Sequence, residues 1–113
     1  MKNKNNWKFI IIIVVVIAIF ALMAFSQPKM ILFYGDTCPH CEVVEEFIAE
    51  NNIKEKIQFK ELEVYNNKAN AQLLYKKATS CGLDVEQGVG VPFFFDGKNC
   101  LLGNKDIIDF LSK

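Results

Sequence analysis

Arginine is missing from the whole chain, and histidine occurs only once, as His40. Arginine is the side chain that binds phosphate through two parallel hydrogen bonds, and the lysines form no dense basic patch of the kind that binds nucleic acid. We therefore expect no nucleic-acid partner. Internal repeats and low-complexity linkers are also missing, and 113 residues suffice for one folded domain.

Polar side chains are absent from the segment 9–25, which has the sequence FIIIIVVVIAIFALMAF. As a helix this segment would be about 25 Å long, at the short end of the lengths that cross a bilayer. Lys2, Lys4 and Lys8 precede it, and Trp7 lies where an interfacial aromatic residue belongs. By the positive-inside rule, the sequence predicts a single-pass membrane anchor with its N-terminus in the cytoplasm and the remainder outside.

This pattern divides the chain into a cytoplasmic segment 1–8, a transmembrane signal-anchor 9–25, a short linker 26–29 and a domain 30–113. Cleavage is the alternative, because Ala24-Phe25-Ser26 is a small-x-small triplet that a signal peptidase accepts, with a cut before Gln27. The domain would then be secreted. The length and unbroken apolarity of the segment 9–25 favour a retained anchor.

Strands and helices are expected to alternate in the domain. The expected strands are Met30–Tyr34, Ile57–Tyr65, Val91–Phe95 and Asn99–Leu102, and the expected helices are Cys38–Asn51, Asn67–Ser80 and a last helix that Asn104 caps. Asp96-Gly97 predicts a two-residue hairpin turn. The first two strands are joined through a helix and should be parallel, whereas the hairpin adds an antiparallel pair. The order predicts an α/β fold, with helices on both faces of a mixed four-stranded sheet.

The motif Cys38-Pro39-His40-Cys41 opens the first helix of this domain. Proline is favourable at the first helical position, which makes Cys38 the N-cap. Its sulfur would face unpaired backbone N–H groups at the positive end of the helix dipole, and His40 adds positive charge when protonated, so the pKa of the Cys38 thiol should fall. Cys41 lies one turn further in and should be the more buried thiol. Such a pair is typical of disulfide exchange, in which Cys38 meets the substrate and Cys41 resolves the mixed disulfide.

Two other interpretations of the motif stay open. A pair of cysteines can be half of a zinc site, but a closed site needs four ligands, and Cys81 and Cys100 have no ligand-like spacing. We therefore expect no metal site and no cofactor. The motif can also be a structural disulfide without turnover. A Cys-x-x-Cys pair that follows a strand and opens a helix favours redox chemistry.

The segments MILFYGDT, CPHC and GVPFFFDGK, in that order, resemble the thioredoxin and glutaredoxin superfamily over residues 29–113. The resemblance implies a minimal, glutaredoxin-like βαβαββα fold. It also implies that Pro92 follows a cis peptide bond and lies against the cysteine motif, and that the backbone of Val91 pairs with an extended substrate segment. Only one glycine, Gly103, stands where glutaredoxins bind glutathione through a Gly-Gly turn, so we do not expect glutathione to be the dedicated partner.

Cys81 and Cys100 belong to no motif that identifies them. An even number of cysteines outside the cytoplasm is typical of an oxidising compartment, which favours a disulfide between the two. Two separate small core residues are the alternative. With a two-residue turn, Cys100 would lie opposite Phe93 and next to Pro92, so the second disulfide is expected near the cysteine motif.

Together these features predict a membrane-tethered thiol–disulfide oxidoreductase that exchanges disulfides with protein thiols outside the cytoplasm. Stabilisation of the Cys38 thiolate favours an oxidant, while a reductase supplied by a membrane redox partner stays open. One alternative is a copper carrier that uses the two thiolates, although no Met-rich or His-rich segment accompanies them. Another is a non-catalytic binding module that uses the groove beside Pro92.

Overall fold

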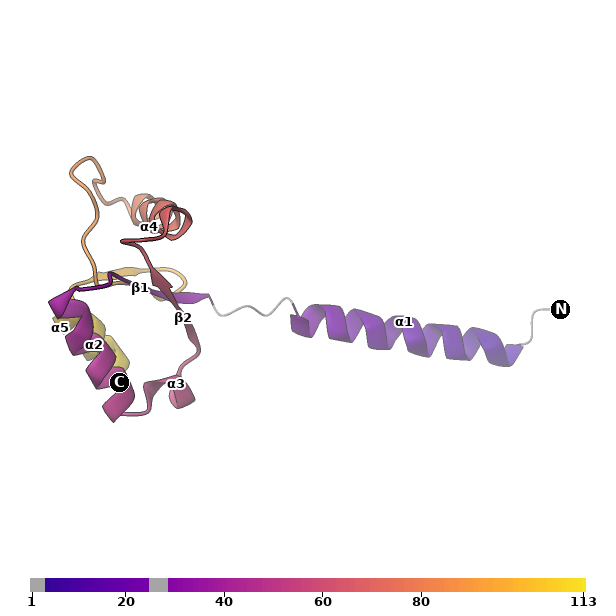
Figure 1. Cartoon of the computed structure of the whole chain (residues 1–113). Coiled ribbons are helices and arrows are strands. Elements are labelled where there is room, and N and C mark those ends of the chain that lie inside the picture. Colours follow the sequence, from indigo (N-terminus) through magenta and orange to yellow (C-terminus); the bar gives the residue numbers. More distant parts are fainter. Residues whose placement is uncertain (1–3, 25–28) are drawn as a thin grey trace.

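The structure, a computed structural model, describes residues 4–24 and 29–113 (Figure 1). Within these residues the elements follow in the order α1 (Lys4–Ala24), β1 (Met30–Tyr34), α2 (Pro39–Glu50), α3 (Ile53–Lys56), β2 (Phe59–Glu63), α4 (Lys68–Ser80), β3 (Phe93–Phe95), β4 (Cys100–Leu102) and α5 (Asn104–Leu111). The mixed α/β class and the apolar N-terminal helix, both predicted from the sequence, are confirmed.

Helix α1 is apolar over most of its length, and none of its residues is buried. It is long and apolar enough to cross a membrane, and a signal sequence near an N-terminus has the same properties. Residues 1–3 and 25–28 lie outside the described part of the chain. The predicted linker, apart from Lys29, and the alternative cleavage site before Gln27 therefore lie outside it as well.

The sheet has the strand order β2-β1-β3-β4. β1 and β2 are parallel, with Tyr34 opposite Glu63, because α2 carries the chain back between them. β3 is antiparallel to both β1 and β4, with Phe33 opposite Phe93. The predicted mixed sheet is thus confirmed, and the C-terminal end of β1 lies beside the N-terminal end of β3.

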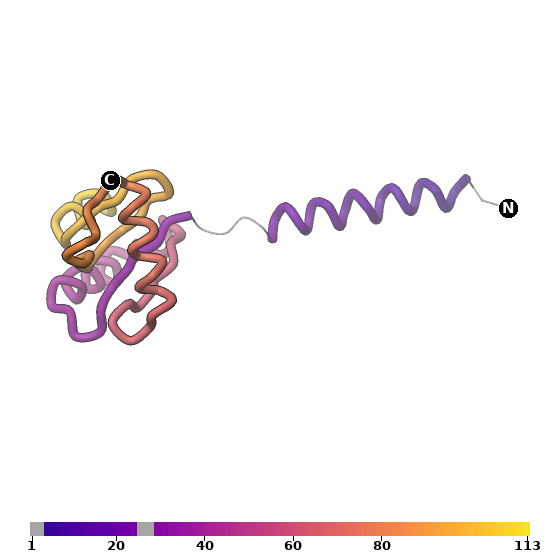
Figure 2. Tube along the Cα trace, turned by 90° about the horizontal axis from the view of Figure 1, so that it is seen from above, coloured from indigo at the N-terminus to yellow at the C-terminus, as the bar shows by residue number. Residues whose placement is uncertain are grey.

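Large apolar side chains fill both faces of the sheet. On one face Leu32 and Phe94 pack against α2 and α5. On the other face Phe33 and Phe93 pack against Leu74 of α4, and the two rings meet edge to face with centroids 5.8 Å apart. Figure 1 shows α4 on one side of the sheet and α2 and α5 on the other, and Figure 2 shows α4 lying over β1. Since each such side chain stabilises the fold by roughly 1.5–3 kcal/mol, β1 and β3 form its centre.

The turn between β3 and β4 lies one residue further along the chain than predicted. Phe95 pairs with Cys100 and the Asp96 N–H donates to the Asn99 carbonyl at 3.0 Å, so the turn is centred on Gly97-Lys98 rather than on Asp96-Gly97. The Asp96 carboxylate stabilises this turn by accepting the backbone N–H of Asn99. Although burial opposes the shift, hydrogen bonds of this kind hold the pKa of Asp96 below its ordinary value. As a result, Cys100 lies opposite Phe95, and the prediction that it lies opposite Phe93 is wrong.

Three further boundaries differ from the sequence predictions. The short helix α3 was not expected, and it forms because Ile53 is buried in the core after Asn52 reverses the chain with a φ of 50°. Strand β2 is shorter than the predicted segment 57–65. Helix α5 is capped by Gly103, whose φ of 84° suits glycine. Asn104 is the first residue of that helix, so the prediction that Asn104 caps it is wrong.

Candidate functional site

The cysteine motif lies where β1 ends and α2 begins. Cys38 is the N-cap of α2 and Pro39 is its first residue, as predicted. A disulfide joins Cys38 to Cys41 across a Cα–Cα distance of 5.2 Å. The backbone N–H of Cys41 donates to the Cys38 Sγ at 3.2 Å. The Cys38 sulfur therefore receives an N–H donor at the positive end of the helix, the contact that stabilises a thiolate when the disulfide opens.

Both cysteines are buried in this disulfide form. The exposed fraction is 5% for Cys38 and 2% for Cys41. The sulfur that was expected to meet the substrate is therefore itself buried in this form, although Cys41 is the more buried of the two. The carbonyl oxygen of Val91 lies 3.7 Å from the Cys38 Sγ and covers part of it. Pro39 and His40, in contrast, are exposed on the first turn of α2. The exposed part of the motif is therefore the start of α2.

The segment before β3 supplies the other side of the site. The peptide bond between Val91 and Pro92 is cis, and the Pro92 side chain is fully buried. The carbonyl oxygen of Pro92 accepts the backbone N–H of Gly103 at 3.1 Å. The antiparallel register places Phe93 opposite Phe33, which brings this segment to the end of β1 and the Val91 carbonyl onto Cys38.

Glu63, at the end of β2, is a site residue that the sequence analysis missed. Its carboxylate accepts backbone N–H groups from Asp36 at 2.8 Å, Tyr65 at 2.9 Å and Asn66 at 2.6 Å. Burial opposes ionisation, yet these hydrogen bonds lower the pKa of Glu63 below its ordinary value. Asp36 belongs to the loop that leads into Cys38, so Glu63 ties that loop to β2. One feature of the sequence could have identified Glu63 as a site residue: it is an acidic residue near the end of the segment that was predicted to pair in parallel with β1.

Gly35 begins the same loop and is buried beneath a tyrosine ring. A Cβ at this position would overlap the ring of Tyr65, so the close approach requires glycine. The carbonyl oxygen of Gly35 accepts the backbone N–H of Cys38 at 3.2 Å. The ring of Tyr65 is itself 56% exposed, and it covers the backbone that sets the position of Cys38.

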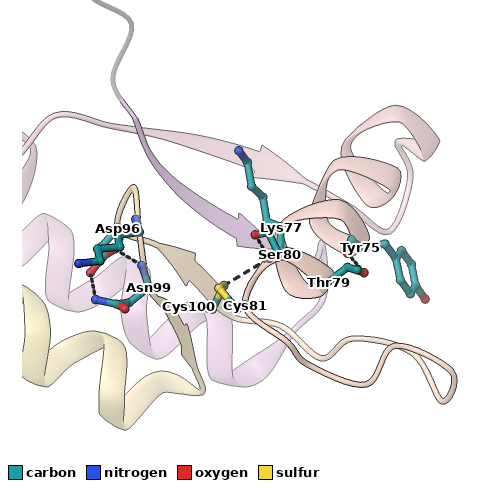
Figure 3. The surroundings of a disulfide bond; sticks show 9 residues. Tyr75, Lys77, Thr79, Ser80, Cys81, Asp96, Asn99 and Cys100 are labelled. Carbon is teal, nitrogen blue, oxygen red and sulfur yellow. Dashed lines mark hydrogen bonds between the residues drawn. A yellow bond between two sulfur atoms is a disulfide. The ribbon is translucent and has the colours of Figure 1, made fainter.

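The second disulfide lies away from this site. Cys81 is the C-cap of α4, and it is bonded to Cys100, the first residue of β4, across a Cα–Cα distance of 6.2 Å (Figure 3). Cys100 lies opposite Phe95, and Phe95 lies opposite Ile31 near the start of β1. Because Cys38 follows the end of β1, the prediction that the second disulfide lies near the motif is wrong. The shift of the hairpin turn to Gly97-Lys98 places Cys100 opposite Phe95 rather than opposite Phe93.

An acidic pocket of about 360 Å³ lies between α2, α3 and β2 and contains none of the predicted site residues. Glu45 lies in the wall of this pocket. Burial, and to a lesser extent the negative charge of Glu61, raise the pKa of Glu45. Burial and the surrounding carboxylates, Glu45 first, also raise the pKa of Tyr34. Lys54 forms an ion pair with Glu61 at 2.9 Å. Within the described residues, no group of His, Cys, Asp or Glu side chains is arranged to hold a metal ion.

Comparison with known proteins adds no family assignment: no protein-family model matches the sequence, and a search of curated proteins finds no match either.

Replacing Glu63 by Gln tests the carboxylate that holds the loop. We expect Glu63→Gln to lower the thermal unfolding temperature at pH 7, because an amide accepts the three N–H groups less well. The folded pKa lies below the unfolded value of about 4.3, so the stabilisation is complete above that pH and is lost as the pH falls through the folded pKa. Melting curves at pH 7 and about pH 3 should therefore show a difference from the unsubstituted protein that narrows in acid.

The matched control is Glu46→Gln, which changes an exposed carboxylate on α2. Its effect should be small at both pH values. A Glu63→Gln variant as stable as the control at pH 7 would contradict the role given to the carboxylate.

Proposed function

We propose that this chain is a thiol–disulfide oxidoreductase that exchanges disulfides with protein thiols through Cys38 and Cys41. The observation that carries the proposal is the Cys38–Cys41 disulfide at the start of α2, with the Cys41 N–H directed at the Cys38 sulfur. A structural disulfide has no need for such a donor, whereas a sulfur that leaves as a thiolate is stabilised by it.

The proposed fold is the minimal thioredoxin-like arrangement. Its support is the element order after α1, in which β1, α2, β2 and α4 are followed by the β3–β4 hairpin and α5. The parallel β1–β2 pair and the cis bond before Pro92, beside the cysteine motif, agree with what the sequence resemblance implies. The short helix α3 would be an addition between α2 and β2.

The exchange would begin with a substrate thiolate that attacks the Cys38 sulfur. The Cys38–Cys41 bond breaks, and Cys41 leaves with the electron pair and takes up a proton. A second substrate thiolate then attacks the first substrate sulfur and forms the substrate disulfide. Cys38 leaves as a thiolate, which the Cys41 N–H and the helix terminus stabilise. The substrate is oxidised by two electrons, and the enzyme pair is reduced.

The substrate is proposed to be an extended polypeptide segment rather than glutathione. The backbone of Val91 lies beside the reacting sulfur, where an extended segment would add main-chain hydrogen bonds. The reaction is proposed to run in the direction that oxidises the substrate, because stabilisation of the Cys38 thiolate makes the Cys38–Cys41 disulfide a stronger oxidant.

Replacing the cysteines tests the reaction. Cys38→Ser should reduce the oxidation of a dithiol peptide to the uncatalysed rate, because no sulfur remains for substrate attack. Reduced Cys41→Ser should instead accumulate a mixed disulfide with a disulfide-bonded substrate, because the resolving thiol is missing. Rates and trapped species are measured by mass spectrometry after alkylation.

The matched control is Cys81→Ala/Cys100→Ala, which removes the other disulfide and should keep peptide oxidation within a few-fold of the original rate. Full activity of Cys38→Ser would show that Cys38 does not carry the reaction. If the unsubstituted protein itself leaves the peptide at the uncatalysed rate, a binding module without catalysis is the better account.

Replacing His40 tests the electrostatic part of the proposal. The Cys38–Cys41 couple is expected above the thioredoxin value of about −270 mV, at roughly −200 to −120 mV. His40→Gln should lower the potential, because it removes a side chain that can carry positive charge one residue from Cys41. His40→Lys is the matched control, since it keeps a positive charge and should keep the potential high. Redox titration against glutathione measures the reduction potential of both variants. If the two variants have equal potentials, the helix terminus alone would account for the raised potential of the couple.

The helix α1 is proposed to remain as a membrane anchor, with the redox domain on the outer side. The support is its length and apolarity together with the lysines before it. N-terminal sequencing of the protein purified from the membrane fraction should give a start before residue 9. A start at Gln27 would show that the segment is a cleaved signal.

A further inference from the structure

The two disulfides lie at opposite ends of their helices. Cys38 precedes the first turn of α2, where unpaired N–H groups form the positive end of the helix dipole. Cys81 follows the last turn of α4, where unpaired carbonyl groups form the negative end. A thiolate is therefore stabilised at Cys38 and disfavoured at Cys81.

The partner of Cys81 also faces a carbonyl group. The Cys100 Sγ lies 3.5 Å from the backbone carbonyl oxygen of Lys77, which accepts a thiol S–H and repels a thiolate. The ammonium group of Lys77 lies over the ring of Phe95, 4.6 Å from its centroid, and Figure 3 shows it extending away from the sulfurs. The Cys38 Sγ also faces a carbonyl oxygen, that of Val91 at 3.7 Å, so this contact does not separate the two pairs. What separates them is the Cys41 N–H at the Cys38 sulfur, which has no counterpart at Cys81 or Cys100 within the described contacts.

These surroundings set the direction of electron flow between the pairs. Thiolate stabilisation favours the reduced form of the Cys38–Cys41 pair and makes its disulfide an oxidant. The Cys81–Cys100 pair lacks this stabilisation, and the fold holds its two Cα atoms within the range of ordinary disulfides. Electrons should therefore pass from the Cys81 and Cys100 thiols to the Cys38–Cys41 disulfide.

Within one folded copy the two pairs lie too far apart to react. Cys100 pairs with Phe95, and Phe95 pairs with Ile31, whereas Cys38 follows Tyr34 at the other end of β1. Three residues of an extended strand span about 10 Å, far more than a sulfur–sulfur bond. The reaction requires a second copy of the chain.

We propose that the Cys38–Cys41 disulfide of one copy oxidises the Cys81 and Cys100 thiols of another, newly made copy. The inference rests on the proposed function and adds this chain itself to its substrates. In the folded copy Cys81 and Cys100 are partly exposed.

The reaction balances without a further reagent. A thiolate from the reduced Cys81–Cys100 pair attacks the Cys38 sulfur of the oxidised copy, and Cys41 leaves and takes up a proton. The other thiol of the pair loses its proton and attacks the intermolecular disulfide. This step forms the Cys81–Cys100 bond and releases Cys38 as a thiolate. Two electrons move from one copy to the other.

The test follows disulfide transfer between two full-length chains in detergent micelles. The acceptor is an isotope-labelled Cys38→Ala/Cys41→Ala chain whose Cys81 and Cys100 are reduced. The oxidant is an equimolar amount of the unlabelled protein with both disulfides formed. After acid quenching and alkylation, mass spectrometry should show more than 90% of the acceptor pair oxidised and an equal loss of the Cys38–Cys41 disulfide.

Two parallel reactions separate the possible failures. A control oxidant that carries Cys38→Ala/Cys41→Ala but keeps its Cys81–Cys100 disulfide should transfer at least tenfold more slowly, and equal transfer overturns the inference. A synthetic dithiol peptide replaces the acceptor in the second reaction. If the peptide is oxidised and the acceptor is not, the inference fails while the proposed function stands. If neither is oxidised, both fail.

A measurement on the unsubstituted protein does not depend on how the variants fold. The oxidised protein is equilibrated in glutathione buffers, and the two pairs are mapped separately. The Cys38–Cys41 pair should be half reduced in a buffer at least about a hundredfold more oxidising than the one that half reduces Cys81–Cys100, the difference that gives more than 90% transfer at equimolar amounts. The reverse order would overturn the inference, because electrons would then flow from the motif to the second pair.

Discussion

The antiparallel pairing of β1 with β3 is the constraint on which the rest of the structure depends. Phe33 and Phe93 lie opposite each other with their side chains buried on the same face. Leu32 and Phe94 repeat the arrangement on the other face. A slip of one residue would exchange the two faces, so apolar burial sets a single register. That register brings Val91 to the end of β1, where Cys38 begins the next helix.

Backbone polar groups do most of the positioning around the sulfur. The Gly35 carbonyl accepts the Cys38 N–H, and the Glu63 carboxylate accepts the N–H of Asp36 in the loop between them. The Cys41 N–H and the Val91 carbonyl then face the sulfur from two directions. These groups come from four segments of the chain, which is why the site forms only in the folded domain.

The same side chain acquires different chemistry at the two ends of a helix. The sulfur of Cys38 receives the Cys41 N–H besides facing the Val91 carbonyl, whereas Cys81 follows carbonyl groups and Cys100 faces one without such a donor among the described contacts. Helix direction therefore distinguishes the pair for which exchange is proposed from the pair that joins α4 to β4. The backbone dipoles act in this direction, in addition to the positive charge that His40 is proposed to supply.

The sequence by itself determined what depends on neighbouring residues. Proline after Cys38 places the helix start, the apolar run defines α1, and the order of apolar segments predicts the mixed sheet. The motif residues were found in the same way, and a family resemblance supplied Val91 and Pro92.

The fold decided what depends on contacts between distant segments. The hairpin turn lies at Gly97-Lys98, where the Asp96 side chain accepts the Asn99 N–H, and this register places Cys100 opposite Phe95. Glu63 reaches the Cys38 loop because parallel strands end at the same edge of the sheet. Local patterns carry no information on register or on which loop a carboxylate meets, because both are set by burial and hydrogen bonding across the whole sheet.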